Sequence, residues 1–217
     1  MNAPLTMAEL LRATAQLLRS GALRSFAALV LLTLAGTLID AGPLPLDLAS
    51  AANLPLSIAT VVVQYHLTRA ALRDAGVELS SKSGFGSLFM MGIVSGLAIA
   101  LGFVFLIVPG VFLVVRWWVA APVLLASEGG ISDALGESWR ETEGSFWPIF
   151  SVLGLIWLPA LAGVAATVIV TADDQTRFAA SLLINLLVNL ALILGWHAAV
   201  AGYVICRRSG ELDEIFA

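Results

Sequence analysis

Polar side chains within long apolar stretches are informative, because such positions are costly in a hydrophobic surrounding. Arg116 lies six residues after Pro109-Gly110 in an otherwise apolar segment. A charge in membrane hydrocarbon is expensive unless it finds water or a partner. Arg116 is therefore a candidate for binding an anion or a lipid headgroup, or for bridging to a polar group on another helix. The alternative is a side chain that extends toward the outer membrane surface beside Trp117 and Trp118.

A second basic group consists of His66, Arg69 and Arg73, whose spacing of i, i+3 and i+7 places them on one face of a helix. They stand at one end of an apolar stretch, where basic side chains can bind the headgroup of an anionic phospholipid. The alternative is ordinary flanking charge, which sets the orientation of a membrane helix.

The amide side chains form a third group. Asn185 and Asn189 follow Ser181 at intervals of four residues, and Gln64 lies in a separate apolar stretch. Amides in lipid are expected to face other helices and share hydrogen bonds. Such a stripe indicates either a polar path for a substrate or contacts between helices.

Catalytic and metal chemistry find little support in the sequence. One cysteine, Cys206, and two histidines, His66 and His197, exclude a multi-cysteine zinc site and are too few for most catalytic metal sites. Neither histidine has an acid at helical spacing, and the nucleophile, phosphate-binding and zinc-protease motifs are missing. We therefore expect no catalytic residues, no metal and no cofactor.

The elements that must position these residues follow from composition. Of 217 residues, 59% are hydrophobic and only 12% are charged, which is too little charge to cover the surface of a soluble domain. The 11 basic residues form no long run, so nucleic-acid binding is not indicated. The sequence predicts an all-α polytopic membrane bundle.

We predict one membrane domain over 1–217. It begins with an amphipathic N-terminal helix over 1–25, where Thr6 and Glu9 have the spacing of a capping box. This helix either lies on the membrane surface or packs on the bundle. Six spans are predicted near 22–39, 54–72, 85–108, 111–126, 146–171 and 178–206.

The segments outside the predicted spans are expected to form loops, a tight turn and a loose tail. Residues 40–53, with Pro43, Pro45 and Asp47, and residues 172–177 are predicted loops, and Pro109-Gly110 is predicted to be a tight turn. Gly92-xxx-Gly96-xxx-Ala100 is expected to pack closely against another helix, either within the fold, which we favour, or between subunits. The tail 207–217 is expected to be loose.

The polar segment 127–145 is predicted to hold an amphipathic helix over 132–143, capped by Ser132. Ser138 and Trp139 on this helix, with the nearby Trp147, form a candidate surface for a membrane-protein partner.

Orientation follows from the basic residues, which gather on the cytoplasmic side of membrane proteins. With a cytoplasmic N-terminus, nine of the 11 basic residues lie inside: Arg12, Arg19, Arg24, Arg69, Arg73, Lys82, Arg140, Arg207 and Arg208. The two outer loops carry Asp40, Asp47, Asp173 and Asp174 instead. We expect a multi-pass protein of the bacterial inner membrane with both termini in the cytoplasm.

One stretch of the chain resembles a known family. It comprises Leu106-Ile107-Val108-Pro109-Gly110-Val111-Phe112-Leu113, Arg116-Trp117, Ala121-Pro122-Val123, Glu128, Ala134-Leu135, Ser138-Trp139, Gly144 and Phe146-Trp147, and more weakly Glu9-Leu10-Leu11. This pattern resembles the bacterial membrane-domain superfamily found in the membrane part of some glycerophosphodiester phosphodiesterases and in related stand-alone inner-membrane proteins.

The resemblance implies a helical domain with about six spans and no settled activity for the stand-alone members. The phosphodiesterases carry catalysis in a separate soluble barrel, whose His, Glu and Asp motifs this sequence lacks, so that activity is not carried over. We expect a non-enzymatic accessory protein that binds membrane phospholipids in envelope or lipid homeostasis, or serves as a subunit of a membrane complex. The alternative is a small transporter that uses Gln64, Asn185, Asn189 and a helix broken at Pro159.

Overall fold

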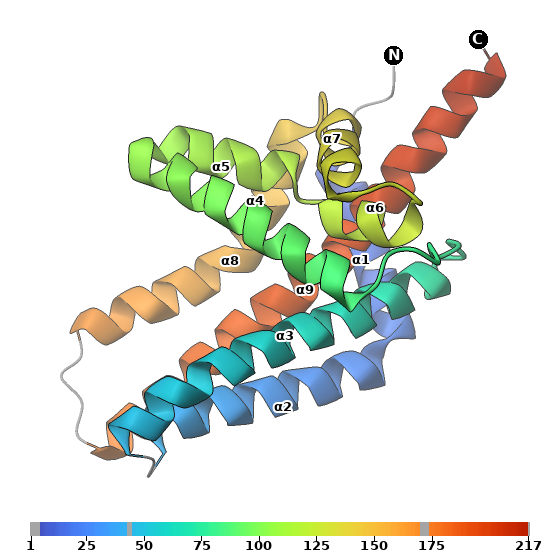
Figure 1. Cartoon of the computed structure of the whole chain (residues 1–217). Helices are drawn as coiled ribbons and strands as arrows, with labels where there is room; N and C mark the ends of the chain where they lie inside the picture. Colours follow the sequence, from blue (N-terminus) through green and yellow to red (C-terminus); the bar gives the residue numbers. More distant parts are fainter. Residues whose placement is uncertain (1–4, 43–44, 170–173, 217) are drawn as a thin grey trace.

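The computed structural model describes residues 5–42, 45–169 and 174–216, and this part of the chain is helical with short connections (Figure 1). The helices are α1 (Met7–Ser20), α2 (Ala22–Ala41), α3 (Leu46–Asp74), α4 (Phe85–Phe105), α5 (Ile107–Arg116), α6 (Ala120–Ala126), α7 (Ile131–Glu141), α8 (Phe146–Ile169) and α9 (Asp174–Phe216). Six segments of the described chain are long and apolar enough to cross a membrane, with α5 and α6 counted as one. The predicted class, an all-α bundle of an integral membrane protein, is confirmed.

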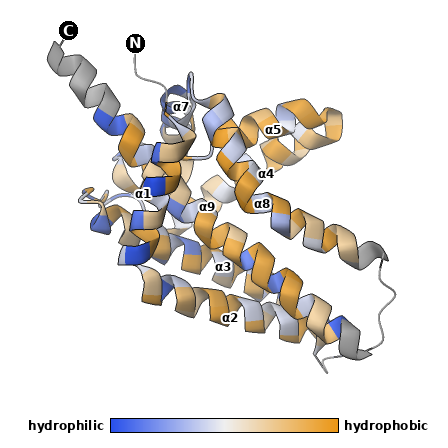
Figure 2. Cartoon of the chain, turned by 180° about the vertical axis from the view of Figure 1, so that it is seen from behind, coloured by the Kyte–Doolittle hydropathy of each residue, from blue (hydrophilic) through white to orange (hydrophobic). Residues whose placement is uncertain are grey.

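The long helices share one end, where the polar elements gather. In Figure 1, α2 and α3 lie side by side with the first half of α9, while the hairpin of α4 and α5 diverges from them. At this end, α1, α6, α7 and the link 75–84 meet the second half of α9. Figure 2 shows hydrophilic residues concentrated there and hydrophobic residues along the long helices. We call this end the polar end.

The nine basic residues predicted to be cytoplasmic all belong to elements that meet at the polar end. They stand on α1, the start of α2, the last turns of α3, the link 75–84, α7 and the second half of α9. The side of the membrane that the polar end faces stays a prediction.

The predicted capping box begins α1. The Thr6 hydroxyl accepts from the Glu9 backbone N–H at 3.3 Å, and the Glu9 carboxylate accepts from the Thr6 N–H at 3.1 Å. Leu10 and Thr14 are buried against α8 and α9, while Arg12 is exposed. Of the two interpretations of this amphipathic helix, the structure therefore supports packing on the bundle.

The loop predicted over 40–53 is wrong for most of its length, because α3 begins at Leu46. Pro45 occupies the N-cap position, and Asp47 lies in the first turn, where a negative charge favours the positive end of the helix dipole. Residues 48–52 then supply leucine and alanine, which are strong helix formers. Pro43 lies outside the described residues.

The turn between the third and fourth spans is at Leu106 instead of the predicted Pro109-Gly110. Leu106 has an extended backbone, and α5 starts directly after it. Pro109 is the third residue of α5, where a backbone N–H has no carbonyl partner in its own helix, so proline costs no hydrogen bond. Gly110 allows close packing, since a Cβ there would lie 2.6 Å from the Phe103 ring.

The fourth span and the amphipathic helix also differ in detail from expectation. The predicted span 111–126 is two helices, α5 and α6, joined by a turn over 117–119. The following helix, α7, begins at Ile131, one residue before the predicted cap at Ser132. The Asp133 carboxylate accepts from the Gly130 N–H at 2.9 Å and caps the helix in its place.

The last two helices follow the prediction along most of their length. The predicted end of the fifth span at 171 and the first part of the turn 172–177, with Asp173, lie outside the described residues. The remainder of that turn is helical, because α9 begins at Asp174. The predicted loose tail is wrong as well, since α9 continues through Phe216, and Arg207 supports it by donating to the Tyr203 hydroxyl at 2.8 Å.

The buried core lies toward the polar end and forms three clusters. One surrounds Leu72, Leu88 and Tyr203, and a second joins α1, α5, α8 and α9 around Leu10 and Ile149. A third is small and contains Ala28, Leu67 and Ile193. Residues of α9 take part in all three, so this helix is the common packing partner of the bundle.

The expected packing of Gly92, Gly96 and Ala100 against a helix of the same chain is wrong. All three are exposed on α4, and no atom outside the helix lies within 4 Å of a Cβ added to Gly92 or Gly96. Only the first part of α4 is buried, at Leu88 and Met91. The diverging hairpin leaves this face of α4 without a partner in the described chain.

Candidate functional site

A cavity of about 280 Å³ lies within the membrane-spanning part of the bundle, among α3, α4, α8, α9 and the α5–α6 turn. It is partly open. Gly92 lines the cavity and is also exposed on the surface of α4, so the cavity reaches the surface at this glycine. The opening therefore lies on a helix that is long and apolar enough to cross a membrane. We call it the α3–α4 cavity.

The residues that line the α3–α4 cavity are largely apolar, and none of those described is charged. Their polar side chains are Gln64 and Thr68 of α3 and Ser95 of α4, together with the indoles of four tryptophans, Trp117, Trp118, Trp157 and Trp196. Binding sites for small hydrophobic molecules combine an apolar wall with a few polar groups in this way.

The Thr68 hydroxyl is the most informative group in the cavity wall. Thr68 is only 2% exposed, and its Oγ1 has no hydrogen-bond partner among the described residues. Hydroxyls in apolar helices usually donate to the carbonyl four residues earlier. Thr14, Thr37, Ser57, Thr60, Ser95 and Thr142 all do so here. Thr68 departs from that pattern, as does the buried Thr33 on α2, which does not line this cavity.

Gln64 stands one helical turn before Thr68. It is half-buried, and no hydrogen bond of its side chain exists within the described part of the chain. The same holds for the indole N–H groups of the four tryptophans. An unpaired polar group in hydrocarbon is unfavourable because no water is present to satisfy it. The α3–α4 cavity therefore presents unused donors and acceptors to any molecule that enters it.

The basic group predicted on α3 does not line this cavity. His66 and Arg73 are exposed, and Arg69 donates to the Tyr65 hydroxyl, with its guanidinium carbon 5.1 Å from the centre of the Tyr65 ring. Arg73 has no ion-pair or hydrogen-bond partner among the described residues. These side chains share one face of α3 near the polar end.

Arg116 connects helices at the polar end and does not reach toward the opposite membrane surface. Its guanidinium lies 5.1 Å from the centre of the Phe112 ring and 5.3 Å from that of Trp139, and Nη1 donates to the Trp139 carbonyl at 3.5 Å. It thus stands near the last carbonyls of both α5 and α7, where a positive charge is favourable. Nε is buried without a partner in the described chain.

Of the three residues in the candidate partner surface, the two tryptophans are exposed and the serine is buried. Ser138 is completely buried, and its hydroxyl donates to the Arg116 carbonyl at 2.8 Å, so the expectation that it contacts a partner is wrong. Trp139 is 37% exposed and Trp147 is 71% exposed. Ser138 belongs to an amphipathic helix, and it lies on the face of α7 that packs against the bundle.

The amides of α9 bind α2 and α9 together and do not line the α3–α4 cavity. The Asn185 amide donates to the Asp40 carboxylate at 2.9 Å and to the Ser181 carbonyl at 3.0 Å, and it lies against Gly36 of α2. Asn189 donates to the Asn185 carbonyl at 2.8 Å. Of the two interpretations given for this stripe, the structure supports contacts between helices.

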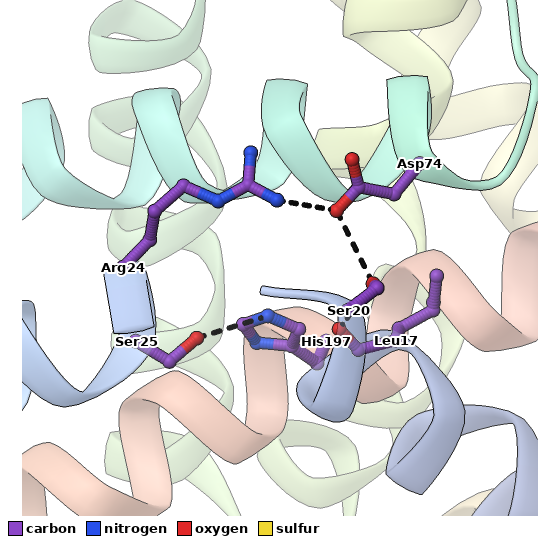
Figure 3. A network of polar contacts seen from close by, with 6 residues as sticks. All are labelled: Leu17, Ser20, Arg24, Ser25, Asp74 and His197. Carbon is purple, nitrogen blue, oxygen red and sulfur yellow. Dashed lines mark hydrogen bonds and ion pairs between the residues drawn. The ribbon is translucent and has the colours of Figure 1, made fainter. Parts of the chain in front are cut away.

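Sequence reasoning missed a polar network that joins α1, α2, α3 and α9 (Figure 3). His197 Nδ1 donates to the Ile193 carbonyl at 2.9 Å, and Nε2 lies within hydrogen-bond distance of the Ser25 hydroxyl, at 3.3 Å. Beside this pair, Asp74 accepts from Ser20 and forms an ion pair with Arg24. No spacing along the chain could reveal these contacts, because they join helices far apart in the sequence.

The Ser25–His197 pair resembles a nucleophile with its base, but its surroundings favour a structural role. Ser25 is 5% and His197 2% exposed. A carbonyl, not a carboxylate, orients the imidazole, and neither residue lines a cavity described here.

Two further cavities lie elsewhere. One of about 310 Å³ among α1, α8 and α9 contains Pro159, and its Thr14 hydroxyl is already paired. Another of about 390 Å³ lies at the polar end beside Arg207 and Arg208. Among the described residues, no group of three or more His, Cys, Asp or Glu could hold a metal ion.

Comparison of the chain with protein-family models, with curated proteins and with solved structures found no match.

Proposed function

We propose that this chain is a non-enzymatic lipid-binding protein of the bacterial inner membrane, with an accessory role in lipid homeostasis of the envelope. The observation that carries the proposal is the α3–α4 cavity, which combines an apolar wall, an opening toward lipid at Gly92 and unused hydrogen-bonding groups at Gln64 and Thr68. Lipid is the molecule that a cavity with these features meets at the highest concentration.

The same cavity gives less support to a transporter. That alternative needs Gln64, Asn185 and Asn189 around one water-filled path, and Pro159 at a break in a helix beside it. Only Gln64 lines the α3–α4 cavity, while Pro159 lines a different one and α8 continues through it. An uncharged, largely apolar wall also suits an ion or charged solute poorly, because transfer of charge into it is costly.

The polar end supplies a second way to contact lipid. The exposed Trp139 and Trp147 and the basic face of His66, Arg69 and Arg73 are the residue types that bind the interfacial region and anionic headgroups. In the accessory role proposed here, these residues hold the polar end at the membrane surface, and Trp139 with Trp147 is the surface offered to a membrane-protein partner.

The experiment compares two glycines of α4 that stand one helical turn apart. Gly92 lines the cavity and Gly96 does not, and a Cβ is accommodated at both positions. We expect the purified full chain and Gly96→Leu to retain lipid in native mass spectrometry after mild detergent extraction. We expect Gly92→Leu, which places a bulky side chain where the cavity reaches the surface, to lose it.

Because both substitutions replace glycine by leucine on an exposed face of the same helix, helix propensity and surface hydrophobicity change equally in the two variants. Retention of the same lipid by Gly92→Leu, or the absence of retained lipid from the unmodified chain, would overturn the proposal.

A further inference from the structure

We infer that the α3–α4 cavity selects an uncharged glycerolipid of the diacylglycerol type, in which a hydroxyl and ester carbonyls replace the phosphate headgroup. This inference rests on the proposed lipid-binding function and specifies the ligand of the same site. Its physical basis is the depth, the chemistry and the charge of the polar groups in the cavity wall.

The depth of Gln64 argues against a phosphate headgroup. Thr68 stands six residues before α3 ends at Asp74, and Gln64 stands ten residues before it. At a rise of about 1.5 Å per residue, these positions lie about 9 Å and about 15 Å from that end of the helix. Gln64 therefore lies deeper along α3 than His66, Arg69 and Arg73, the basic side chains of that helix, whereas Thr68 lies level with them. A lipid without a charged headgroup can place its polar atoms at this depth.

The chemistry of the two side chains fits a hydroxyl next to an ester. Thr68 can donate to a carbonyl oxygen or accept from a hydroxyl, and the Gln64 amide can do both at once. Four residues of helix separate them by about 6 Å. The hydroxyl and ester groups of a diacylglycerol are only a few bonds apart, so one molecule can reach both side chains.

The lack of charge among the described residues of the cavity wall also favours an uncharged ligand. None of the described residues that line it is charged, and Arg116, Arg69 and Arg73 are all directed elsewhere. A phosphate drawn into this wall would lose its hydration without gaining a cation. An uncharged lipid avoids that cost, and it satisfies the Thr68 hydroxyl, which is buried without a partner.

The test uses the four tryptophans of the cavity wall as reporters. The purified full chain in detergent is titrated with dioleoylglycerol brominated at its double bonds, which quenches indole fluorescence on contact. A second titration uses brominated dioleoylphosphatidylglycerol, which has the same acyl chains and an anionic headgroup. We expect tighter binding of the brominated diacylglycerol, by about tenfold, and quenching by it that is lost in Gly92→Leu but kept in Gly96→Leu.

Thr68→Val tests the proposed hydrogen bond and Thr33→Val is its matched control. Both threonines are buried, and both hydroxyls have no partner in the described chain, but only Thr68 lines the cavity. We expect Thr68→Val to weaken diacylglycerol binding about tenfold, as the loss of one buried hydrogen bond does, and Thr33→Val to leave it unchanged. Gln64→Leu is the second variant and is expected to weaken binding similarly.

The outcomes separate this inference from the proposed function. If Gly92→Leu abolishes quenching but the two lipids bind equally and both Thr68→Val and Gln64→Leu bind normally, lipid binding stands and the selectivity for an uncharged lipid is overturned. If neither lipid produces quenching that depends on Gly92, the proposed function and the inference both fail.

Discussion

Glu128 and Glu141 both belong to the polar end, and their surroundings shift the pKa of their carboxyl groups in opposite directions. The Ser81 backbone N–H donates to Glu128 at 3.2 Å, with Lys82 Nζ 3.4 Å away, and these contacts lower its pKa. Burial raises the pKa of Glu141, and the neighbouring Glu137 adds to the effect. The two residues therefore contribute to stability with opposite dependence on pH.

We predict that Glu141→Gln raises the melting temperature at pH 7, because the folded state accommodates the ionised carboxylate of Glu141 less well than the unfolded chain does. This gain should vanish as the pH falls below the ordinary value of about 4.5, where both states are protonated. Glu128→Gln should lower the melting temperature at pH 7, and its effect should fade as the pH falls through the lowered pKa.

Thermal unfolding of the two variants in detergent between pH 4 and 8 measures both effects. Shifts of the same sign at pH 7 would contradict the assignment of opposite surroundings.

At the scale of single residues, the sequence predicts which residues share a helix face. It does not predict which residues of other helices they contact. The spacing of Asn185 and Asn189 is sufficient to place them together, but their contact with Asp40 depends on how α2 packs against α9. No feature of the sequence indicated that Thr68 is a candidate site residue. A threonine in an apolar helix usually bonds to its own backbone, and the cavity that makes Thr68 exceptional is built by other helices.

Among the elements, the α4–α5 hairpin shows why a turn motif can be misplaced. Proline followed by glycine is typical of a turn, but proline is equally favourable in the first turn of a helix. The structure uses Pro109 in that second way and turns at Leu106. Gly102 and Gly110 allow α4 and α5 to pack closely, since a Cβ on Gly102 would lie 2.9 Å from the Cα of Gly110.

We predict that Gly102→Ala lowers the melting temperature even though alanine is the better helix former. Its Cβ would meet backbone atoms of α5, which cannot move aside without opening the hairpin, at a cost of about 1–3 kcal/mol. Gly96→Ala provides the control, because its Cβ meets nothing within 4 Å and helix propensity alone should raise or preserve stability. Equal melting temperatures for the two variants would argue against close packing at Gly102.

For the whole molecule, composition was sufficient to predict an all-α membrane bundle, because so apolar a chain can satisfy its backbone in lipid only as helices or a closed barrel. Composition could not predict how the helices pack. Side chains that face lipid and side chains that face the core are equally apolar in a membrane protein. The spacing of Gly92 and Gly96 therefore cannot be distinguished from that of glycines that pack against another helix.

The predicted orientation is testable with single cysteines in a Cys206→Ser background. Asp47 and Ser81 are both exposed and lie toward opposite ends of α3 and its following link. With the polar end in the cytoplasm, a membrane-impermeant maleimide added to intact spheroplasts should label Asp47→Cys fully. It should label Ser81→Cys at least tenfold less until the membrane is permeabilised. The reverse pattern would place the polar end outside.

The shared role of α9 in the three core clusters has a consequence for biogenesis. This helix is synthesised after α1–α8, so the earlier helices enter the membrane before the partner that buries Leu10, Leu67 and Leu72 exists. Pairs such as α2 with α3 and α4 with α5 contact each other directly and can pack before α9 is made. The three core clusters, in contrast, are completed only when α9 is in place.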